Sequence, residues 1–457
     1  MAGTDAGGTG SQGGSEGMGT LRAAVRSLRH PNYRLFFLGQ LVSLIGTWMQ
    51  SVAESWLVYR LTGSVALLGL VGFSSQIPVF LLASIGGAVA DRGNRHRILI
   101  VTQSLAMLLA FTLAGLTLSG HIRVWMVFVL AALLGLVNAF DLPARQAFVP
   151  ELVAREDLLN AIALNSSMFN AARVIGPAVA GILVSTIGEG WCFFANAASY
   201  IAVIAGLLLM KVAPGAGRRR PSTVTAFQDI AEGFRFVART GPIRALLLLL
   251  GVVSFVGMPY VVLMPVFADR ILHAGARGLG LLTGASGVGA VLGSLILAAR
   301  RGVRGLGGWV ALACAGFGVS LILFSTSRSF PLSVALLLPV GFSMMVQMAS
   351  SNTLIQAMVP DELRGRVMSV YSMMFMGMAP FGALVAGAVA ERIGAPWTIA
   401  SGGAVCIVAA GVFALRVPVH RGTARQLILA NQMVGGEPAQ TMEGNTAAVV
   451  AESAVSS

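Results

Sequence analysis

Charged residues are scarce in this chain, and their scarcity excludes a soluble globule. Only 11% of the 457 residues are Asp, Glu, Lys or Arg, whereas a typical soluble domain has roughly 25%. Hydrophobic residues make up 56% of the chain, and the mean hydropathy of +0.81 leaves too little polar surface to face water. The composition therefore predicts an integral membrane protein whose surface is covered by lipid.

Cysteine is also rare, and several enzyme motifs are missing. The three cysteines lie inside apolar runs, at positions 192, 314 and 406, where they are expected to act as small packing residues and not as disulfides or metal ligands. The sequence contains no Walker-type glycine-rich loop, no His-Glu zinc pattern and no nucleophile elbow. These absences argue against an enzyme, and we expect neither a cofactor nor a bound metal.

Basic residues outnumber acidic ones, and the net charge is +13. Such an excess is found in proteins that neutralise nucleic-acid phosphates. In this chain, however, the arginines lie in short loops between apolar runs and form no continuous basic face. A nucleic-acid partner is therefore not expected.

Alternating apolar runs and polar breaks predict twelve transmembrane helices, because one crossing takes about 20 residues. The expected spans are residues 34–60, 65–90, 98–119, 122–142, 158–188, 191–211, 243–269, 277–299, 309–326, 331–358, 366–391 and 396–416. Little length remains for a separate catalytic domain. The predicted fold class is an all-α integral membrane protein.

The distribution of basic residues orients these spans. One set of alternate loops holds most of the 31 Lys and Arg residues, and the other set holds only Arg60, Arg123, Arg270, Arg277, Arg328 and Arg392. Because Lys and Arg in short loops stay in the cytoplasm, both termini are predicted to be cytoplasmic. The expected location is a bacterial plasma membrane, with the lipid bilayer as a partner.

A polar stretch at residues 212–242 divides the spans into two groups of six. The expected domains are a disordered tail (1–30), a first bundle (31–211), a linker (212–242), a second bundle (243–416) and a second disordered tail (417–457). Related passages occur in both bundles: residues 149–152 lead to 176–181, and residues 359–363 lead to 382–387. Two parallel halves are typical of secondary transporters, although chance similarity between Gly- and Ala-rich helices is an alternative.

The most specific motif lies between the second and third spans. It reads Gly86-Gly87-Ala88-Val89-Ala90-Asp91-Arg92-Gly93-Asn94-Arg95-His96-Arg97. This passage resembles the loop signature of the major facilitator superfamily, except that Asn94 stands where that family has glycine. Because Asn also tolerates a left-handed turn, the resemblance holds and implies the major facilitator fold, two pseudo-symmetric six-helix bundles.

The motif predicts a gating loop formed by Gly87, Asp91, Arg92, Arg95 and Arg97. Gly87 would let two helices approach closely. Asp91 would lie against the positive N-terminal end of the eleventh span, near residues 365–366, in one conformation only. A topogenic basic loop with an incidental aspartate is the alternative interpretation.

Two further passages resemble efflux members of the superfamily. Residues 170–181 are similar to the Gly-Pro motif in the fifth helix of exporters, which implies a hinge at Gly176, Pro177 and Gly181; ordinary packing by small residues is the alternative. Residues 141–151, followed by Asn160 and Asn165, resemble the efflux subfamily of enterobactin exporters and transmembrane secretion effectors.

Two opposite charges inside the spans are candidates for proton coupling. Arg173 is expected near the middle of the bilayer, and Glu54 lies in the outer half of the first span. A carboxylate beside an arginine can alternate between ionised and neutral as its access to water changes. Glu54 is therefore the predicted proton site, with Arg173 as its partner; a static ion pair or an interfacial Glu54 is the alternative.

Other polar residues complete the candidate site. The expected lining of the central cavity is Gln50, Gln76, Asn138, Asn165, Asn170, Gln347, Asn352 and Gln356, each of which could equally bond a neighbouring helix. Salt bridges between the halves that open and close with the cycle are expected to involve Asp141, Arg145, Glu151, Asp361, Arg364 and Arg366; a surface role without such bridges is the alternative.

These features predict a monomeric secondary active transporter that exports small amphipathic molecules, drugs or a siderophore, in exchange for protons. The two halves would rock around a site at the middle of the membrane. Uptake of a metabolite or flipping of a lysophospholipid by the same fold is one alternative. A membrane sensor or scaffold that does not transport is another.

Overall fold

The computed structural model describes residues 25–211, 226–300, 302–303 and 305–434, and every regular element in these ranges is a helix. Twelve helical segments are long and apolar enough to cross a membrane. The predicted all-α class and the predicted number of spans are therefore confirmed.

The first six spans form one half of the molecule, the N-half. A short helix η1 (Arg26–Arg29) precedes α2 (Pro31–Thr62), α3 (Val65–Arg92), α4 (Arg95–Leu118) and α5 (Val124–Phe148). Two single turns, η2 (Val149–Glu151) and η3 (Arg155–Asp157), lead to α6 (Leu158–Ile187) and α7 (Glu189–Leu209). The turn between α2 and α3 is tight because Gly63 takes a left-handed conformation, at φ 60°, and Ser64 caps α3 by accepting from the Leu67 amide.

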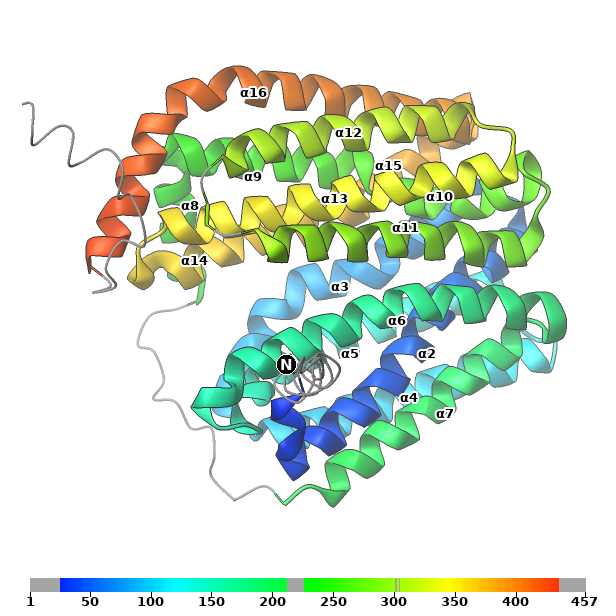
Figure 1. Ribbon diagram of the computed structural model, residues 1–457. Coiled ribbons are helices and arrows are strands. Elements are labelled where there is room, and N and C mark those ends of the chain that lie inside the picture. The colour runs from blue at the N-terminus through cyan, green and yellow to red at the C-terminus, as the bar shows by residue number, and fades with distance from the viewer. Residues whose placement is uncertain (1–24, 212–225, 301, 304, 435–457) are drawn as a thin grey trace, which may run out of the picture.

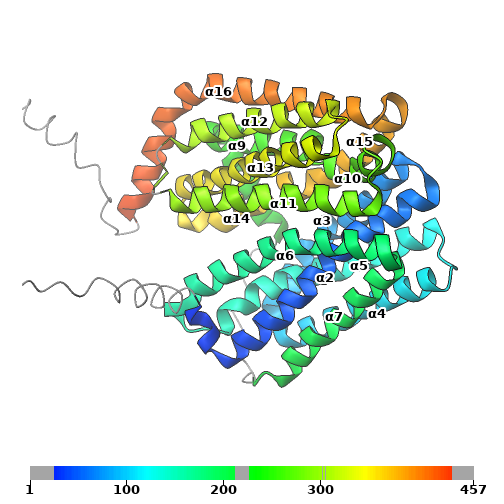
Figure 2. The ribbon, with the colours of Figure 1, turned by 45° about the vertical axis from the view of Figure 1, so that its right-hand side comes forward.

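The last six spans form the C-half, which begins after the helix α8 (Ala226–Arg239). The seventh span joins α9 (Gly241–Val252), the π-helical η4 (Val253–Gly257), α10 (Tyr260–Val266) and the π-helical η5 (Phe267–Ile271). Then follow α11 (Gly275–Ala299), α12 (Leu306–Thr326) and α13 (Phe330–Met358). The eleventh span joins α14 (Asp361–Ser372), the π-helical η6 (Met373–Gly377) and α15 (Met378–Ile393), and α16 (Ala395–Val434) is the twelfth. Figures 1 and 2 show the two halves as separate layers of helices.

Small residues let the two halves meet backbone to backbone. The principal contacts between them are α3 with α15 and α6 with α11. A Cβ atom on Gly69 would lie 2.4 Å from the Ala383 carbonyl oxygen, and one on Gly280 would lie 2.5 Å from the Pro177 carbonyl oxygen. Only glycine fits at such distances, so these two seams depend on glycine.

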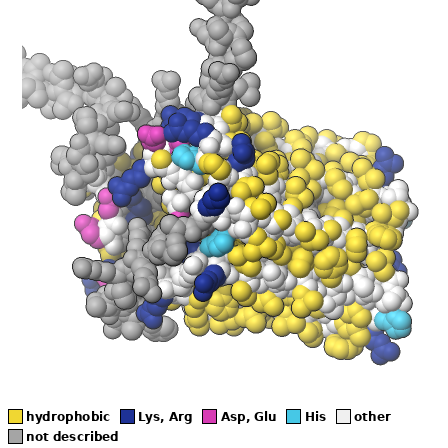
Figure 3. Space-filling model, turned by 90° about the horizontal axis from the view of Figure 1, so that it is seen from below, with side chains coloured by type: hydrophobic (Ala, Val, Ile, Leu, Met, Phe, Trp, Pro, Cys, Tyr) yellow, Lys and Arg dark blue, Asp and Glu magenta, His cyan; other side chains and the backbone are white. Residues whose placement is uncertain are grey.

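Charge separates the two ends of the bundle. The end where α3 ends and α4 begins, called here the basic end, carries Asp91, Arg92 and Arg97, whereas the opposite end carries Arg60 and Arg270. In Figure 3 the basic residues gather at one end, and a broad hydrophobic surface covers the helices beside it. This surface is the belt that lipid would cover.

The segment 417–434, expected to be part of a disordered tail, is helical. It continues α16 beyond Pro418, and in Figure 1 this last part of α16 turns across the basic end of the C-half. Val417, Ala424, Leu427 and Ile428 pack against the C-half core, and Asn431 donates to the Val359 carbonyl oxygen at 3.0 Å. These apolar positions recur with helical spacing, a signal that the sequence contained and the prediction overlooked. Residues 435–457 lie outside the described residues.

The N-terminal prediction is also corrected at its end, since residues 26–29 of the expected tail form η1. Asp157, which is fully buried, accepts from Arg29 at 2.8 Å and pairs with His30 at 2.7 Å. Ser27 donates to the Asn160 side chain at 2.7 Å. The pairs with Asp157 give a buried carboxylate cationic partners, and together with the Ser27 bond they fix the segment against η3 and α6. Residues 1–24 of the tail lie outside the described residues, as do 212–225 of the expected linker.

Candidate functional site

The two halves are joined at the end opposite the basic end. Arg270 donates to the Gly63 carbonyl oxygen at 3.0 Å and lies over the Tyr59 ring at 5.5 Å. Ser64 donates to the Glu391 carboxylate at 3.2 Å. Figure 1 shows α6 approaching α11 toward this same end and diverging from it toward the basic end. These contacts therefore close the interface between the halves at the end of the bundle opposite the basic end.

At the basic end, three ion pairs join residues of one half or join the C-half to the helix α8 that precedes it. Arg95 contacts Asp91 at 3.4 Å and also pairs with Glu151. Arg364 pairs with Asp361 at 2.5 Å, three residues away. Arg366 pairs at 2.8 Å with Glu232 of α8, a helix that packs on α14. Salt bridges of these residues between the halves stay a prediction for a conformation in which the basic end closes.

The structure corrects the role of Gly87 in the gating loop. A Cβ atom on Gly87 would meet nothing within 4 Å, so this glycine is not a point of close approach. The neighbouring Gly86 is a point of close approach, because a Cβ atom on Gly86 would lie 2.0 Å from the Ala139 carbonyl oxygen of α5. The motif predicted a close helix contact correctly but placed it one residue too late. Arg92 and Arg97 are exposed.

Replacement of Asp91 by Asn is expected to slow transport several-fold while leaving membrane insertion unchanged. Asp91 is exposed and lies 3.4 Å from Arg95. The predicted gating role requires Asp91 to turn toward the C-half, and an amide would remove its charge there. Initial transport rates, normalised to the amount of inserted protein, measure the effect. An unchanged rate would remove the gating role of this residue.

The Gly-Pro passage lies where α6 touches both α2 and α11. A Cβ on Gly176 would lie 2.5 Å from the Trp48 Cβ, and one on Gly181 would lie 3.0 Å from the Gly280 Cα. Pro177 stands inside a helix that is continuous from 158 to 187. These positions therefore provide close packing, and the hinge motion around them stays a prediction.

Asp141 was expected at the interface between the halves, and this expectation is wrong for the structure described. The residue is 1% exposed and lies inside the N-half. It accepts from the Thr102 hydroxyl at 2.8 Å and from the Gln103 amide at 2.7 Å, both on α4, and it pairs with Arg145 one turn away on α5. The sequence signal for this cluster was a Thr-Gln pair within an otherwise apolar run, which the prediction did not use.

Glu54 lies in a small pocket inside the N-half. Gln50 lines this pocket with five apolar side chains, Leu109, Leu113, Leu130, Ala131 and Leu134. Gln50 accepts from the Asn196 amide of α7 at 2.6 Å and lines the same pocket as Glu54. Gln50 was predicted to line the central cavity, but its contacts place it within the N-half core.

Arg173 does not pair with Glu54. Both residues are described, and no ion pair joins them. The Arg173 guanidinium instead lies over the Trp48 ring, 5.9 Å from its centroid. Its backbone lies against α11 of the C-half, where a Cβ atom on Gly287 would be 3.0 Å from the Arg173 carbonyl oxygen. The predicted partnership is therefore corrected: Glu54 faces the N-half core, and Arg173 faces the interface with the C-half.

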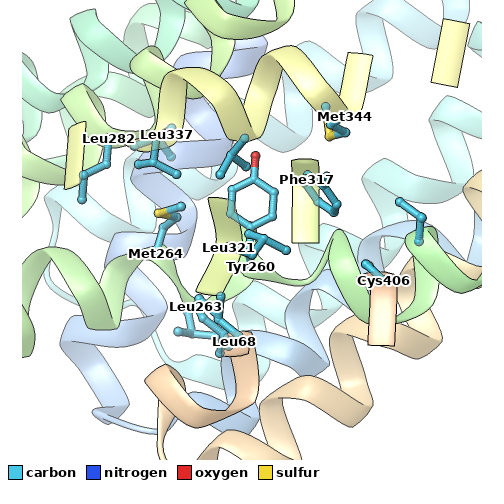
Figure 4. Packing of buried hydrophobic residues seen from close by; sticks show 14 of the residues in the cluster. Leu68, Tyr260, Leu263, Met264, Leu282, Phe317, Leu321, Leu337, Met344 and Cys406 are labelled. Carbon is cyan, nitrogen blue, oxygen red and sulfur yellow. The ribbon is translucent and has the colours of Figure 1, made fainter. Parts of the chain in front are cut away.

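Tyr260 is a buried polar residue of the C-half that the sequence analysis did not single out. Its hydroxyl is 2.7 Å from the Ser286 hydroxyl of α11, and its ring packs edge-on against Phe317. Figure 4 shows Tyr260 among Leu263, Met264, Phe317 and Met344, with its hydroxyl pointing away from most of these apolar side chains. A tyrosine in an apolar run carries no sequence signal of this kind, because its partners come from other helices.

The other polar candidates differ in their surroundings. Gln347 is buried in α13, and its amide nitrogen has no hydrogen-bond partner. Asn170 donates to the Ser166 carbonyl oxygen and Gln356 to Asn352, each within its own helix. Gln76 is exposed, whereas Asn138, Asn165 and Asn352 are partly buried. Their contact with cargo stays a prediction.

Two six-helix halves that meet along α3–α15 and α6–α11, with intramembrane charges between and within them, define a membrane transporter of the major facilitator fold. The chain belongs to the family of transmembrane secretion effectors, whose model matches residues 22–452. The predicted family and the prediction that the chain is not an enzyme are both confirmed.

Individual relatives are similar at modest identity. The chain is 27% identical to the staphyloferrin A transporter of Staphylococcus aureus over 79% of its own length and 90% of the relative's. It is also 27% identical to the multidrug efflux pump Tap of Mycolicibacterium fortuitum, over 79% and 89%. Among solved structures, the nucleoside transporter NupG superposes with a TM-score of 0.64 at 16% identity, over 85% of this chain and 99% of NupG.

Proposed function

We propose that this protein is a proton-coupled exporter of small amphipathic molecules that works by alternating access as a monomer. The basic end faces the cytoplasm, with both termini, and the membrane is a bacterial plasma membrane. The positive-inside rule supports this orientation. The efflux pump among the relatives supports export.

The conformation described is then the inward-facing one. Contacts of Arg270, Ser64 and Glu391 hold the halves together at the outer end. At the cytoplasmic end, Arg95 pairs with Glu151 within the N-half, and Arg366 pairs with Glu232 of the adjoining helix α8. Rocking about the glycine seams would exchange these two sets of contacts and expose the interface to the other side.

Glu54 is the observation that carries the proton step. It is a carboxylate within a candidate membrane-spanning helix, in a pocket lined by Gln50 and five apolar side chains, and no ion pair joins it to a described Lys or Arg. Carboxylates inside membrane proteins mark ion pathways and proton relays, because ionisation without a counter-charge is costly there. Protonation would make Glu54 neutral in this conformation, and release would require water to reach the pocket in another.

Transport by purified protein in vesicles tests the proposal. Vesicles are loaded either with ethidium or with dansyl-glycine, and the outer solution is acidified. We expect the inward proton gradient to accelerate loss of dye from vesicles with protein, and an uncoupler to abolish the acceleration. If the gradient accelerates the loss of neither dye, the proposed proton-coupled export is wrong.

A further inference from the structure

Arg173 is a cation at the middle of the helix α6, a candidate membrane span, and no described residue is its counter-ion. It lies 15 residues from the start of α6 and 14 from its end, or roughly 22 Å from each at 1.5 Å per residue. Its guanidinium forms neither an ion pair nor a hydrogen bond with any described side chain, and its partner is the Trp48 ring. A charge at this depth is costly, so a residue kept there normally has a partner or a function.

Among the residues that the structure describes, no carboxylate forms an ion pair with this guanidinium. Glu54 is directed into its own pocket in the N-half. Asp141 is already bonded by Thr102, Gln103 and Arg145. Of the carboxylates nearer the two ends of the bundle, Glu189 pairs with Arg60 and Glu391 accepts from Ser64. The missing counter-charge would therefore have to come from a bound molecule.

The surroundings of Arg173 describe the rest of that molecule. Arg173 is only partly buried, as is Trp48. Phe169, one turn earlier on α6, packs edge-on against Trp48 at 5.7 Å and remains 48% exposed. On the C-half side, Gly287 approaches the Arg173 backbone, where a Cβ would lie 3.0 Å from the Arg173 carbonyl oxygen. A cation therefore stands beside flat apolar rings, at the seam between the moving halves.

We propose that Arg173 selects anionic cargo: it binds the acidic group of an amphipathic organic anion whose apolar body packs on Trp48 and Phe169. This inference rests on the proposed transport function and specifies its substrate class. A guanidinium suits a carboxylate because it donates two parallel hydrogen bonds, and the aromatic rings suit a body that is planar or greasy. Because the site lies at the seam, closure of the halves would change its access to each side.

Binding of two probes that differ in charge alone tests the proposal. Dansyl-glycine carries a carboxylate, and dansyl-glycinamide replaces it with an uncharged amide. The full chain is placed in nanodiscs of neutral phosphatidylcholine, and energy transfer from tryptophan to the dansyl group reports binding. We expect the carboxylate probe to bind about tenfold more tightly than the amide, the equivalent of about 1.4 kcal/mol.

Variants then assign the preference to Arg173. Arg173→Gln should bind the two probes equally, with the affinity for the amide unchanged, which shows that the fold is intact. Arg173→Lys keeps the charge and should retain part of the preference, but it lacks the paired donors. The matched control is Arg123→Gln, because Arg123 is an exposed arginine at the end of the bundle opposite the basic end. This variant should bind both probes as the unmodified chain does.

The outcomes separate this inference from the transport proposal. If the unmodified chain does not prefer the carboxylate, or if Arg173→Gln keeps the preference, Arg173 does not select anionic cargo, whatever the vesicle experiment shows. Nanodiscs with anionic phosphatidylglycerol are compared with the neutral ones. If phosphatidylglycerol suppresses the binding of dansyl-glycine to the unmodified chain but not the binding of dansyl-glycinamide, the site takes a lipid headgroup in preference to cargo. The cargo assignment is then overturned. If the chain prefers the carboxylate probe but a proton gradient does not accelerate dye loss from vesicles, only the proposed proton coupling is overturned.

Discussion

Replacement of Glu54 by Gln is expected to abolish acceleration of transport by a proton gradient. The amide has nearly the shape of the carboxylic acid, so it fits the pocket formed by Gln50 and the leucines of α4 and α5, but it cannot release a proton. The protein would then still bind cargo at the seam, because Glu54 faces the N-half core and not Arg173. Dye efflux from vesicles, with and without an acidic outer solution, measures the loss.

A matched control distinguishes this site from a general effect of removing one charge. Glu362→Gln makes the same chemical change on an exposed residue at the start of α14 and should leave gradient-driven transport intact. Glu54→Asp keeps a titratable group one methylene shorter and should retain part of the activity. A Glu54→Gln protein with full gradient-driven transport would show that the proton is carried elsewhere, with the Asp141 cluster as the next candidate.

The fold could be predicted from the sequence because its cause is local. Each apolar run long enough to cross a bilayer must satisfy its backbone internally and so becomes a helix, and this argument needs no knowledge of neighbouring helices. The same reasoning failed at residues 417–434, where the apolar positions 424, 427 and 428 are fewer and cover only one face. An amphipathic helix that lies across the end of a bundle has too little hydrophobicity to be recognised as a span.

The site was less predictable because side-chain direction is set by tertiary contacts. Glu54 and Arg173 were correctly identified as intramembrane charges, but depth along two helices does not tell which way each side chain turns. Likewise, Asp141 was singled out, whereas its partners Thr102 and Gln103 lie on a different helix. A single sequence gives the periodicity of each helix, and it does not give the rotation of one helix relative to the next.

Glycine seams account for the second large effect that we expect. Gly280→Val should prevent the halves from closing at the end opposite the basic end. The Cβ atom of the new side chain would lie 2.5 Å from the Pro177 carbonyl oxygen and 2.7 Å from the Gly181 Cα. Backbone atoms cannot turn aside as a side chain can. The measurement uses a chain with its three buried cysteines replaced by Ala and with Val184→Cys, a buried position on α6 near this seam. A membrane-impermeant thiol reagent should label this cysteine much faster when Gly280→Val is present.

The same substitution inside one half should act on stability instead of on conformation. Gly341 packs on α11 within the C-half, where a Cβ would lie 1.8 Å from the Ser286 carbonyl oxygen. In the proposed rocking motion these two helices would move together, so Gly341→Val should lower the free energy of unfolding by about 3 kcal/mol and reduce the yield of folded protein. Gly280→Val should unfold at nearly the same temperature as the unmodified chain, because the halves can separate at the seam and relieve the clash. If Gly280→Val destabilises the protein as much as Gly341→Val does and leaves labelling at position 184 unchanged, the α6–α11 seam is a fixed part of the core, and alternating access cannot use it.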